Sequence, residues 1–399
     1  MAINMEKGSV SIDAQNIMPV IKRWLYSDQD IFLREVVSNA CDAITKHRMK
    51  FGADEEMRVQ VTVNKEEKTI TISDTGIGMT ADEVRRYINQ VAFSGATEFM
   101  KQFEGDEKKG DIIGHFGLGF YSVFMVSDKV EIVTLSSQEG AEAVHWASED
   151  GMSFELGAGE RASHGTDIIL HISEDAKEFL EVYRVREVLT RYCGFMAHPV
   201  YLFDACAKPF EREEEVKGLT DADGKPVKRT VTEEPKPSLI NETAPLWLKK
   251  PSDCTEQEYL DLYHKLFGFE EPLFWVHLNV DYPFNLKGIL YFPKIKNDFG
   301  TNEGQVKLFS GQVFVADNVK EVIPEFLMLL KGVIDCPDLP LNVSRSFQQN
   351  DGTVKKLSAH ITKKVADKLV GLYNTERETY EKYWDDIRPF VKFGCMKDQ

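Results

Sequence analysis

A chain of 399 residues is long enough for two or three domains, and each half can bury a hydrophobic core of its own. The formal net charge of −17 disfavours nucleic acid or an anionic membrane as a partner, because phosphate groups bind positive surfaces. The sequence has no run of 18 apolar residues that predicts a membrane-spanning helix, and its N-terminus lacks the apolar run of a signal peptide. Six scattered cysteines, without a CxxC pair or zinc spacing, are typical of a reducing environment and predict a cytoplasmic protein.

Hydrophobic periodicity in the first half of the chain predicts two helices and four strands. The helices are predicted at residues 17–25, behind a cap at Asp13, and at 30–49; the strands are predicted at 59–63, 69–73, 129–135 and 167–172. Helices combined with a largely antiparallel sheet predict an α/β fold, a two-layer α/β sandwich.

A charged stretch at 211–236 separates this part from the rest of the chain. It is nearly free of large apolar residues and contains a turn signal at Asp223–Pro226, which predicts a linker with a hairpin. We therefore expect a first domain at 1–212, a linker at 213–236 and a second α/β domain at 237–399. The second domain is predicted to hold strands at 274–280 and 288–292 and helices at 357–373 and 376–387.

The second predicted helix carries a polar stripe formed by Glu35, Asn39, Asp42 and Lys46, spaced at helical intervals. The opposite stripe is apolar and consists of Leu33, Val37, Ala40 and Ile44. A solvated surface face is one interpretation. The alternative is a buried ion site, because Asn39 is a poor helix former, a glutamate can orient and deprotonate water, and an amide oxygen can bind Mg²⁺.

The strand at 69–73 runs into Asp74, Gly76, Gly78 and Met79. A tight turn is the plain interpretation of this DxGxG pattern. In a nucleotide site, Asp74 would accept a hydrogen bond from an exocyclic amine. The two glycines would let a flat base approach the backbone, and Met79 would pack against it.

A glycine-rich run at 114–122 precedes an apolar run at 123–126 that is expected to begin a helix. Glycine amides at a helix N-terminus form an anion site, although this run is neither a P-loop nor a Rossmann fingerprint. The charged segment 94–114 is predicted to be a mobile lid or an ordinary surface loop. Thr166 opens a strand, where its hydroxyl would lie near the base or serve as a plain strand residue.

The motifs IFLREVVSNACDAI, ISDTGIGMT and IGHFGLGFYSVFMVSDKV, in this order, closely resemble the heat-shock-protein-90 chaperones. That family belongs to the ATPase superfamily that also holds gyrase B, histidine kinases and MutL. The segments APLWLKKPSDCTEQEY, VKLFSGQVFVADN and VIPEFLMLLKGVIDCPDLPLNVSRS resemble the middle part of the same family, so the resemblance covers essentially the whole chain. It is closest to the bacterial branch.

The resemblance implies a Bergerat-type ATP-binding fold followed by part of an α/β middle domain, and an ATP-hydrolysing chaperone that uses ATP/ADP and Mg²⁺. It implies that Glu35 is the catalytic base, Asn39 the Mg²⁺ ligand and Asp74 the adenine reader. Gly78 and Thr166 would assist Asp74. Further implied nucleotide contacts are Asp42, Lys46, Met79, Gly114, Phe116, Gly117, Leu118, Gly119 and Phe120.

In the second domain the resemblance implies that Arg345, in a loop at about 339–349, reaches the γ-phosphate, with Gln349 nearby. The lid would span about 94–120. Phe93 and Ser346 depart from the family pattern, where lysine and glutamate are usual, which bears on lid closure and hydrolysis rate.

The implied partners are unfolded or partly folded client proteins, and neither nucleic acid nor a membrane. A homodimer is expected of the full-length protein, and a weak dimer or a monomer of this chain, because the C-terminal dimerisation domain of the family is expected to lie outside it. Three alternatives are a DNA-handling ATPase of the gyrase B or MutL type, a signalling kinase and a non-hydrolysing binding module. The negative charge opposes the first, the lack of a phospho-acceptor histidine helix opposes the second, and Glu35 with Arg345 opposes the third.

Overall fold

A computed structural model describes residues 28–52, 57–90, 118–220, 226–294, 305–339, 341 and 352–397, without the side chains of 213–228. The chain divides into two compact units. Of the described residues, the first unit holds those up to Thr190 and His198–Ile240, while the second holds Arg191–Ala197 and those from Asn241 onward. In the described part of the chain, no helix is both long enough and apolar enough to cross a membrane.

The first unit is built on an eight-stranded sheet with the order β10-β7-β1-β2-β6-β3-β4-β5. Neighbouring strands are antiparallel, except that β1 and β7 are parallel. The strands are β1 (Val59–Asn64), β2 (Thr69–Asp74), β3 (Ser127–Leu135), β4 (Val144–Ser148), β5 (Glu155–Ala158), β6 (Gly165–Ile172), β7 (Val200–Asp204) and β10 (Ser238–Leu239).

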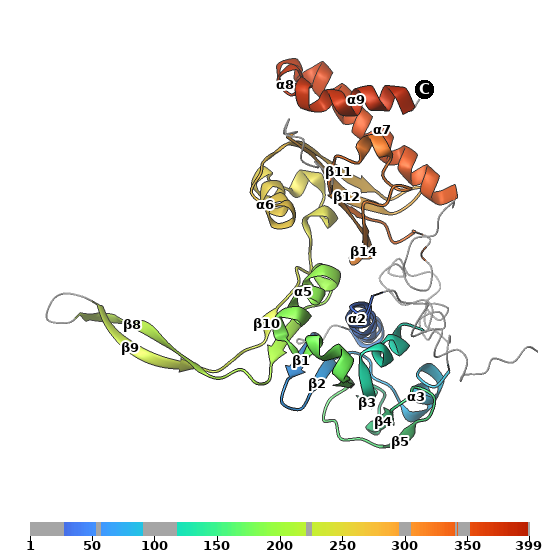
Figure 1. Cartoon of the computed structure of the whole chain (residues 1–399), viewed down its shortest axis with the longest axis vertical. Coiled ribbons are helices and arrows are strands. Elements are labelled where there is room, and N and C mark those ends of the chain that lie inside the picture. Colours follow the sequence, from blue (N-terminus) through green and yellow to red (C-terminus); the bar gives the residue numbers. More distant parts are fainter. Residues whose placement is uncertain are drawn as a thin grey trace, which may run out of the picture. The chain divides into compact units, whose positions relative to one another are not determined.

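Helices cover one face of this sheet and form the second layer (Figure 1). The helices around this sheet are α2 (Ile31–Phe51), α3 (Ala81–Tyr87), α5 (Val182–Cys193) and the short 3-10 helices η3 (Gly119–Met125) and η4 (Glu174–Leu180), of which α2, η3 and η4 contact its strands. Helix α2 packs against β1, β2 and η3. Val59, Val61 and Val63 of β1 are fully buried, whereas the residues between them are half-exposed, as expected of a sheet with one covered face. The predicted two-layer α/β sandwich is confirmed.

The charged segment after β7 forms a hairpin. β8 (Phe210–Thr220) and β9 (Pro226–Glu233) are antiparallel, and among the described strands they pair with each other alone (Figure 1). The hairpin predicted from the turn signal is therefore confirmed.

The second unit contains a five-stranded sheet with the order β11-β12-β15-β13-β14. Its strands are β11 (Pro272–Val280), β12 (Leu286–Pro293), β13 (Gln305–Ser310), β14 (Val313–Asp317) and β15 (Lys331–Asp335). Its helices are α6 (Glu256–Phe267), α7 (Gly352–Thr375), α8 (Arg377–Lys382), α9 (Trp384–Lys397) and the short η5 (Leu246–Leu248), η6 (Pro251–Asp253) and η7 (Glu325–Leu327). Apolar residues of α7, including Leu357 and Ile361, join those of the strands in one core, which confirms the α/β class of this unit.

Two helix predictions are wrong in detail. The run at 123–126 does not begin a helix: it lies at the end of η3, and β3 begins at Ser127, where pairing with β6 takes over. The helix predicted at 376–387 is broken at Tyr383, whose backbone adopts φ −90° and ψ 0° and ends α8. The ring of Tyr383 stacks 6.3 Å from that of Phe274, and its carbonyl accepts the hydrogen bonds that start α9.

The other predicted helices and strands that fall on described residues are present, with ends that differ by a few residues. The helix predicted at 17–25 with its cap at Asp13, most of the predicted lid, and the loop around Arg345 and Gln349 lie outside the described residues.

Candidate functional site

The polar stripe of α2 is partly buried in the protein interior. Glu35 and Asp42 are each 4% exposed, and Asn39 and Lys46 are half-buried. Burial lowers the pKa of the Lys46 ammonium, while the nearby carboxylates of Asp42 and Glu83 oppose that shift. A solvated surface face is therefore excluded for Glu35 and Asp42.

The carboxylate of Glu35 lies between a guanidinium and the glycine-rich motif. Its Oε1 accepts a hydrogen bond of 2.9 Å from Arg34 Nε and lies 2.8 Å from Arg34 Nη2, and both side chains are buried. On the other side, a methyl group added at Gly119 would lie 2.5 Å from Glu35 Oε2. Two motifs that are far apart in the sequence thus meet at this carboxylate.

The residues after Gly119 form η3 and are held by aromatic contacts. Phe120 is 8% exposed, and its ring lies 5.9 Å from that of Trp146 in an edge-on arrangement. Tyr121 donates a hydrogen bond of 2.5 Å to the carbonyl of Ile88. These contacts fix the described end of the glycine-rich motif against β4 and the end of α3.

Asp74 ends β2 with its carboxyl group buried at 5% exposure. Burial raises the pKa of this carboxyl to about 7, against the opposing effects of the Gly76 N–H and the Arg161 guanidinium. The Gly76 N–H donates to Asp74 Oδ1 at 2.7 Å. A methyl group at Gly76 would lie 2.5 Å from the backbone of Ala43, and the Ile77 N–H donates to the Ala43 carbonyl at 3.0 Å, so α2 also supports this turn.

Gly78 and Met79 lie beside the ends of β3 and β6. Gly78 has φ +63°, and a methyl group there would lie 1.9 Å from the carbonyl oxygen of Leu135, so the position requires glycine. The Met79 N–H donates to the hydroxyl of Thr134 at 2.9 Å. That hydroxyl is also 3.0 Å from the hydroxyl of Thr166 and 3.1 Å from the Gly165 carbonyl.

Asp74, Gly78, Met79 and Thr166, predicted as one group, therefore share a single hydrogen-bonded neighbourhood. Thr134 belongs to it and is fully buried, but motif analysis missed it. Along β3, the buried residues Val130, Ile132 and Thr134 alternate with more exposed ones, and this alternation is the sequence signal that Thr134 is buried.

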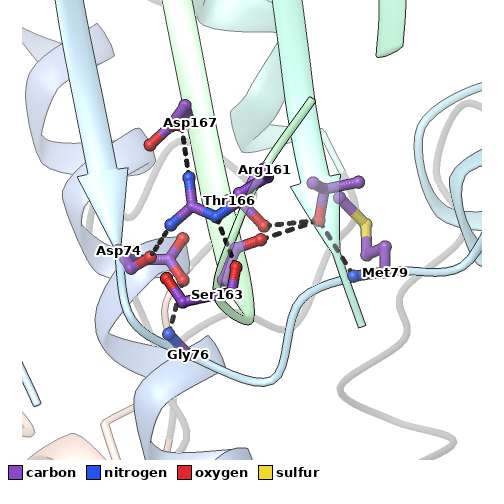
Figure 2. Close-up of polar contacts among 9 residues, drawn as sticks. Asp74, Gly76, Met79, Arg161, Ser163, Thr166 and Asp167 are labelled. Carbon is purple, nitrogen blue, oxygen red and sulfur yellow. Dashed lines mark hydrogen bonds and ion pairs between the residues drawn. The ribbon is translucent and has the colours of Figure 1, made fainter. Parts of the chain in front are cut away.

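Arg161 is the second residue that motif analysis missed. Its Nη2 donates to the Asp74 carbonyl at 2.8 Å, its Nε donates to the Ser163 carbonyl at 3.0 Å, and its Nη1 forms an ion pair with Asp167 (Figure 2). Nothing in the local sequence pairs it with Asp74, because the two residues are 87 positions apart.

Of the remaining predicted residues, Leu118 is half-buried at the start of η3. Gly114, Phe116, Gly117, Arg345 and Gln349 lie outside the described residues. Among the described residues, no cluster of three or more histidine, cysteine or acidic side chains is arranged to hold a metal ion.

Comparison with known proteins gives the class of the site. Residues 28–175 match the sequence model of the ATPases described as histidine kinase-, DNA gyrase B- and HSP90-like. The polar stripe of α2, the DxGxG turn and Thr166 all lie within this match, so they belong to an ATPase domain of that class. Residues 178–399, more than half of the chain, match the model of the Hsp90 protein. The chain belongs to the Hsp90 family.

Relatives from several bacteria have similar sequences. The "Chaperone protein HtpG" of Porphyromonas gingivalis (strain ATCC BAA-308 / W83) is 46% identical over 401 residues, which cover 99% of this chain and 56% of the relative. The "Chaperone protein htpG" of Bacteroides fragilis (strain 638R) is 46% identical over 402 residues, with the same coverage. The protein of the same name from Idiomarina loihiensis is 36% identical over 407 residues, covering 99% and 62%. The chain thus spans about half the length of the curated relatives it matches.

The contact between Gly119 and Glu35 yields a stability prediction. We expect Gly119→Ala to lower the free energy of unfolding by about 1–3 kcal/mol, because the added methyl overlaps a buried carboxylate. Gly157→Ala is the matched control, since Gly157 is exposed in β5 and an added methyl meets no atom within 4 Å. Urea denaturation measures both changes. Equal costs for the two variants would contradict the close packing of Gly119 on Glu35.

Proposed function

We propose that this chain binds ATP and ADP through its first unit and hydrolyses ATP in a Mg²⁺-dependent reaction that drives the remodelling of client proteins. The observation that carries the proposal is the convergence on α2 of the DxGxG turn and the glycine-rich motif. Gly76 packs on Ala43 and Gly119 packs on Glu35, two residues of the same helix. Membership of the Hsp90 family and relatives named as chaperones support the same function.

The buried cluster around Asp74 is suited to recognising adenine. In its ionised form the Asp74 carboxylate can accept a hydrogen bond from the exocyclic amine, a stronger interaction than one between neutral groups. Glycine at 76 and 78 lets the turn pack closely against Ala43 and Leu135, and the base would lie beside this turn. The hydroxyl pair of Thr134 and Thr166 supplies a polar edge beside them. Met79, which follows these glycines, would contact the base.

Glu35 is suited to act as general base. Its carboxylate is buried and fixed by Arg34, and it touches the glycine-rich motif, whose amides at Gly117 and Gly119 we expect to hold phosphate. A base fixed next to the γ-phosphate can take a proton from the attacking water. We further propose that Arg345 and Gln349 of the second unit complete the phosphate site, since charge that develops in phosphoryl transfer requires a nearby cation.

The α2 stripe fits Mg²⁺ in its chemistry. Asn39 follows Glu35 by one helical turn, it is half-buried, and its amide oxygen is a hard ligand. Mg²⁺ keeps several waters and takes few protein ligands when it binds with a nucleotide, so a single amide is sufficient. When bound, the ion would neutralise phosphate charge, while Asn39 orients it and the half-buried Lys46 adds positive charge to the same stripe.

The proposal extends to the whole protein. We propose that clients are unfolded or partly folded proteins, that the full-length protein is a homodimer and that it acts in the cytoplasm. The DNA-handling alternative has less support, because the second half of the chain matches the Hsp90 model and the net charge is −17.

Nucleotide binding is tested through stability. Mg·ADP at 100 times its dissociation constant should add about 2.7 kcal/mol to the unfolding free energy.

Asp74→Asn should weaken ADP binding by roughly 1.5–3 kcal/mol, because it removes the charge-assisted hydrogen bond. Asp335→Asn is the matched control, since Asp335 is also a buried carboxyl with a raised pKa but belongs to the second unit. Melting curves with and without Mg·ADP measure the effect. If Mg·ADP stabilises Asp74→Asn as much as the unsubstituted chain, Asp74 does not contribute to ADP binding and only shapes the turn.

The proposed base is tested through turnover. Glu35→Ala should keep ADP affinity within a few-fold and lose about 10²–10⁴ in hydrolysis rate, because a general base acts in the transition state. Glu131→Ala serves as the control, since Glu131 is also held by hydrogen bonds but pairs with His145 and His171. Phosphate release measures the rate. An unchanged rate in Glu35→Ala would remove Glu35 from the mechanism.

A further inference from the structure

The loop between β5 and β6 contacts the backbone of the turn that contains Asp74. All three guanidinium nitrogens of Arg161 are engaged, with the Asp74 carbonyl, the Ser163 carbonyl and the Asp167 carboxylate (Figure 2). The Arg161 side chain is 11% exposed and that of Asp167 is 29% exposed. The guanidinium therefore fixes the backbone of the residue whose carboxylate is proposed to read adenine.

Close packing makes this contact specific. Gly165 has φ +120°, and a methyl group there would lie 2.1 Å from the Asp74 carbonyl oxygen and 2.8 Å from Arg161 Nη2. His164 Nδ1 lies 2.8 Å from the Gly76 carbonyl oxygen, and its ring stacks on that of His47 at 4.2 Å. The loop thus contacts the backbone of the DxGxG turn at two residues, 74 and 76.

The same residues set the charge around the Asp74 carboxyl. The guanidinium of Arg161 lowers the pKa of Asp74, and the carboxylate of Asp167 raises it. Titratable residues around this turn include Arg161 and His164 from the loop and Asp167 from β6. His47 of α2 stacks on His164, and Arg58, just before β1, is bonded through its backbone to Thr75. Arg161 and Asp167 form an ion pair with each other, yet they act on Asp74 in opposite directions.

We propose that Arg161 is a positioning residue for adenine recognition, which fixes the Asp74 backbone and, together with Asp167, sets the pH range over which the site holds an adenine nucleotide. This inference rests on the proposed function. Its consequence follows from the charge of Asp74. Because the ionised carboxylate is the acceptor, ADP affinity should fall as the pH drops below the pKa of Asp74.

Two substitutions break the ion pair between Arg161 and Asp167. Because they remove charges of opposite sign, they distinguish an effect on the charge of Asp74 from structural support alone. Arg161→Gln removes the positive charge and should move the midpoint of the affinity profile to higher pH by about one pH unit. Asp167→Asn removes the negative charge and should move the midpoint to lower pH. Below both midpoints a shift of one unit corresponds to about a tenfold change in Kd. Well above them, Asp167→Asn should leave affinity nearly unchanged, and Arg161→Gln should keep only the loss that comes from its missing contact with the Asp74 backbone.

The experiment is isothermal titration of the whole chain with Mg·ADP between pH 5.5 and 9.5. Titration of the ADP phosphates is common to all variants and cancels when each is compared with the unsubstituted chain. Arg161→Lys keeps the charge and should restore the midpoint even where some affinity is lost. Arg184→Gln is the control, because Arg184 is similarly half-buried but pairs with Asp30, Glu178 and Glu187.

Opposite shifts for Arg161→Gln and Asp167→Asn, with the midpoint kept in Arg161→Lys, would support the inference. If Arg161→Gln does not fold, Arg161→Lys and Asp167→Asn still decide it. Affinity losses of equal factor at every pH, or shifts in the same direction, would overturn it and leave Arg161 a structural residue. If the unsubstituted chain binds no ADP at any pH, the proposed function fails, and the inference fails with it.

Discussion

The site depends on a carboxyl group buried at the end of β2. Burial disfavours the charged form of Asp74, so its pKa rises to about 7. A carboxyl whose folded-state pKa lies above its usual value stabilises the fold at acidic pH, and this stabilisation is lost as the pH rises through 7. At neutral pH the nucleotide-free protein therefore carries a free-energy cost at Asp74. A ligand that donates a hydrogen bond to the carboxylate can offset this cost, which is why Asp74 is better explained by recognition than by folding.

Helix α2 brings the turn after Asp74 together with the glycine-rich motif. Its apolar stripe packs on β1 and β2, and its other side supports two glycine motifs at once. Ala43 supports the turn after Asp74, and the carboxylate of Glu35 touches Gly119. Neither glycine has room for a methyl group, because the backbone of Ala43 or the carboxylate of Glu35 lies within 2.5 Å of where it would stand. The spacing between base recognition and the proposed general base is thus fixed by the positions of two residues on one helix.

Sequence patterns predicted the parts of this site that are local. Alternating valines predict β1, and the residues at 74–79 predict a turn, because each of these features depends on neighbouring residues. Arg161 could not be predicted, since its contact with Asp74 joins residues 87 positions apart, and Thr134 meets Met79 from 55 positions away. The expectation that a helix begins at 123–126 was wrong, because these residues lie at the end of η3 and β3 follows at Ser127. The domain boundaries and the residue roles, including that of Arg345, stay predictions.

The central claim is that an ionised, buried Asp74 reads adenine, and the titration of its carboxyl carbon tests this most directly. Carbon-13 NMR of chain labelled at the aspartate carboxyl groups, with Asp74 assigned by the loss of its signal in Asp74→Asn, gives its pKa in the free and ADP-saturated protein. The account predicts a pKa of about 7 in the free protein and a value lower by at least one unit with ADP, because the bound amine favours the charged carboxylate. A pKa that ADP leaves unchanged would contradict the account.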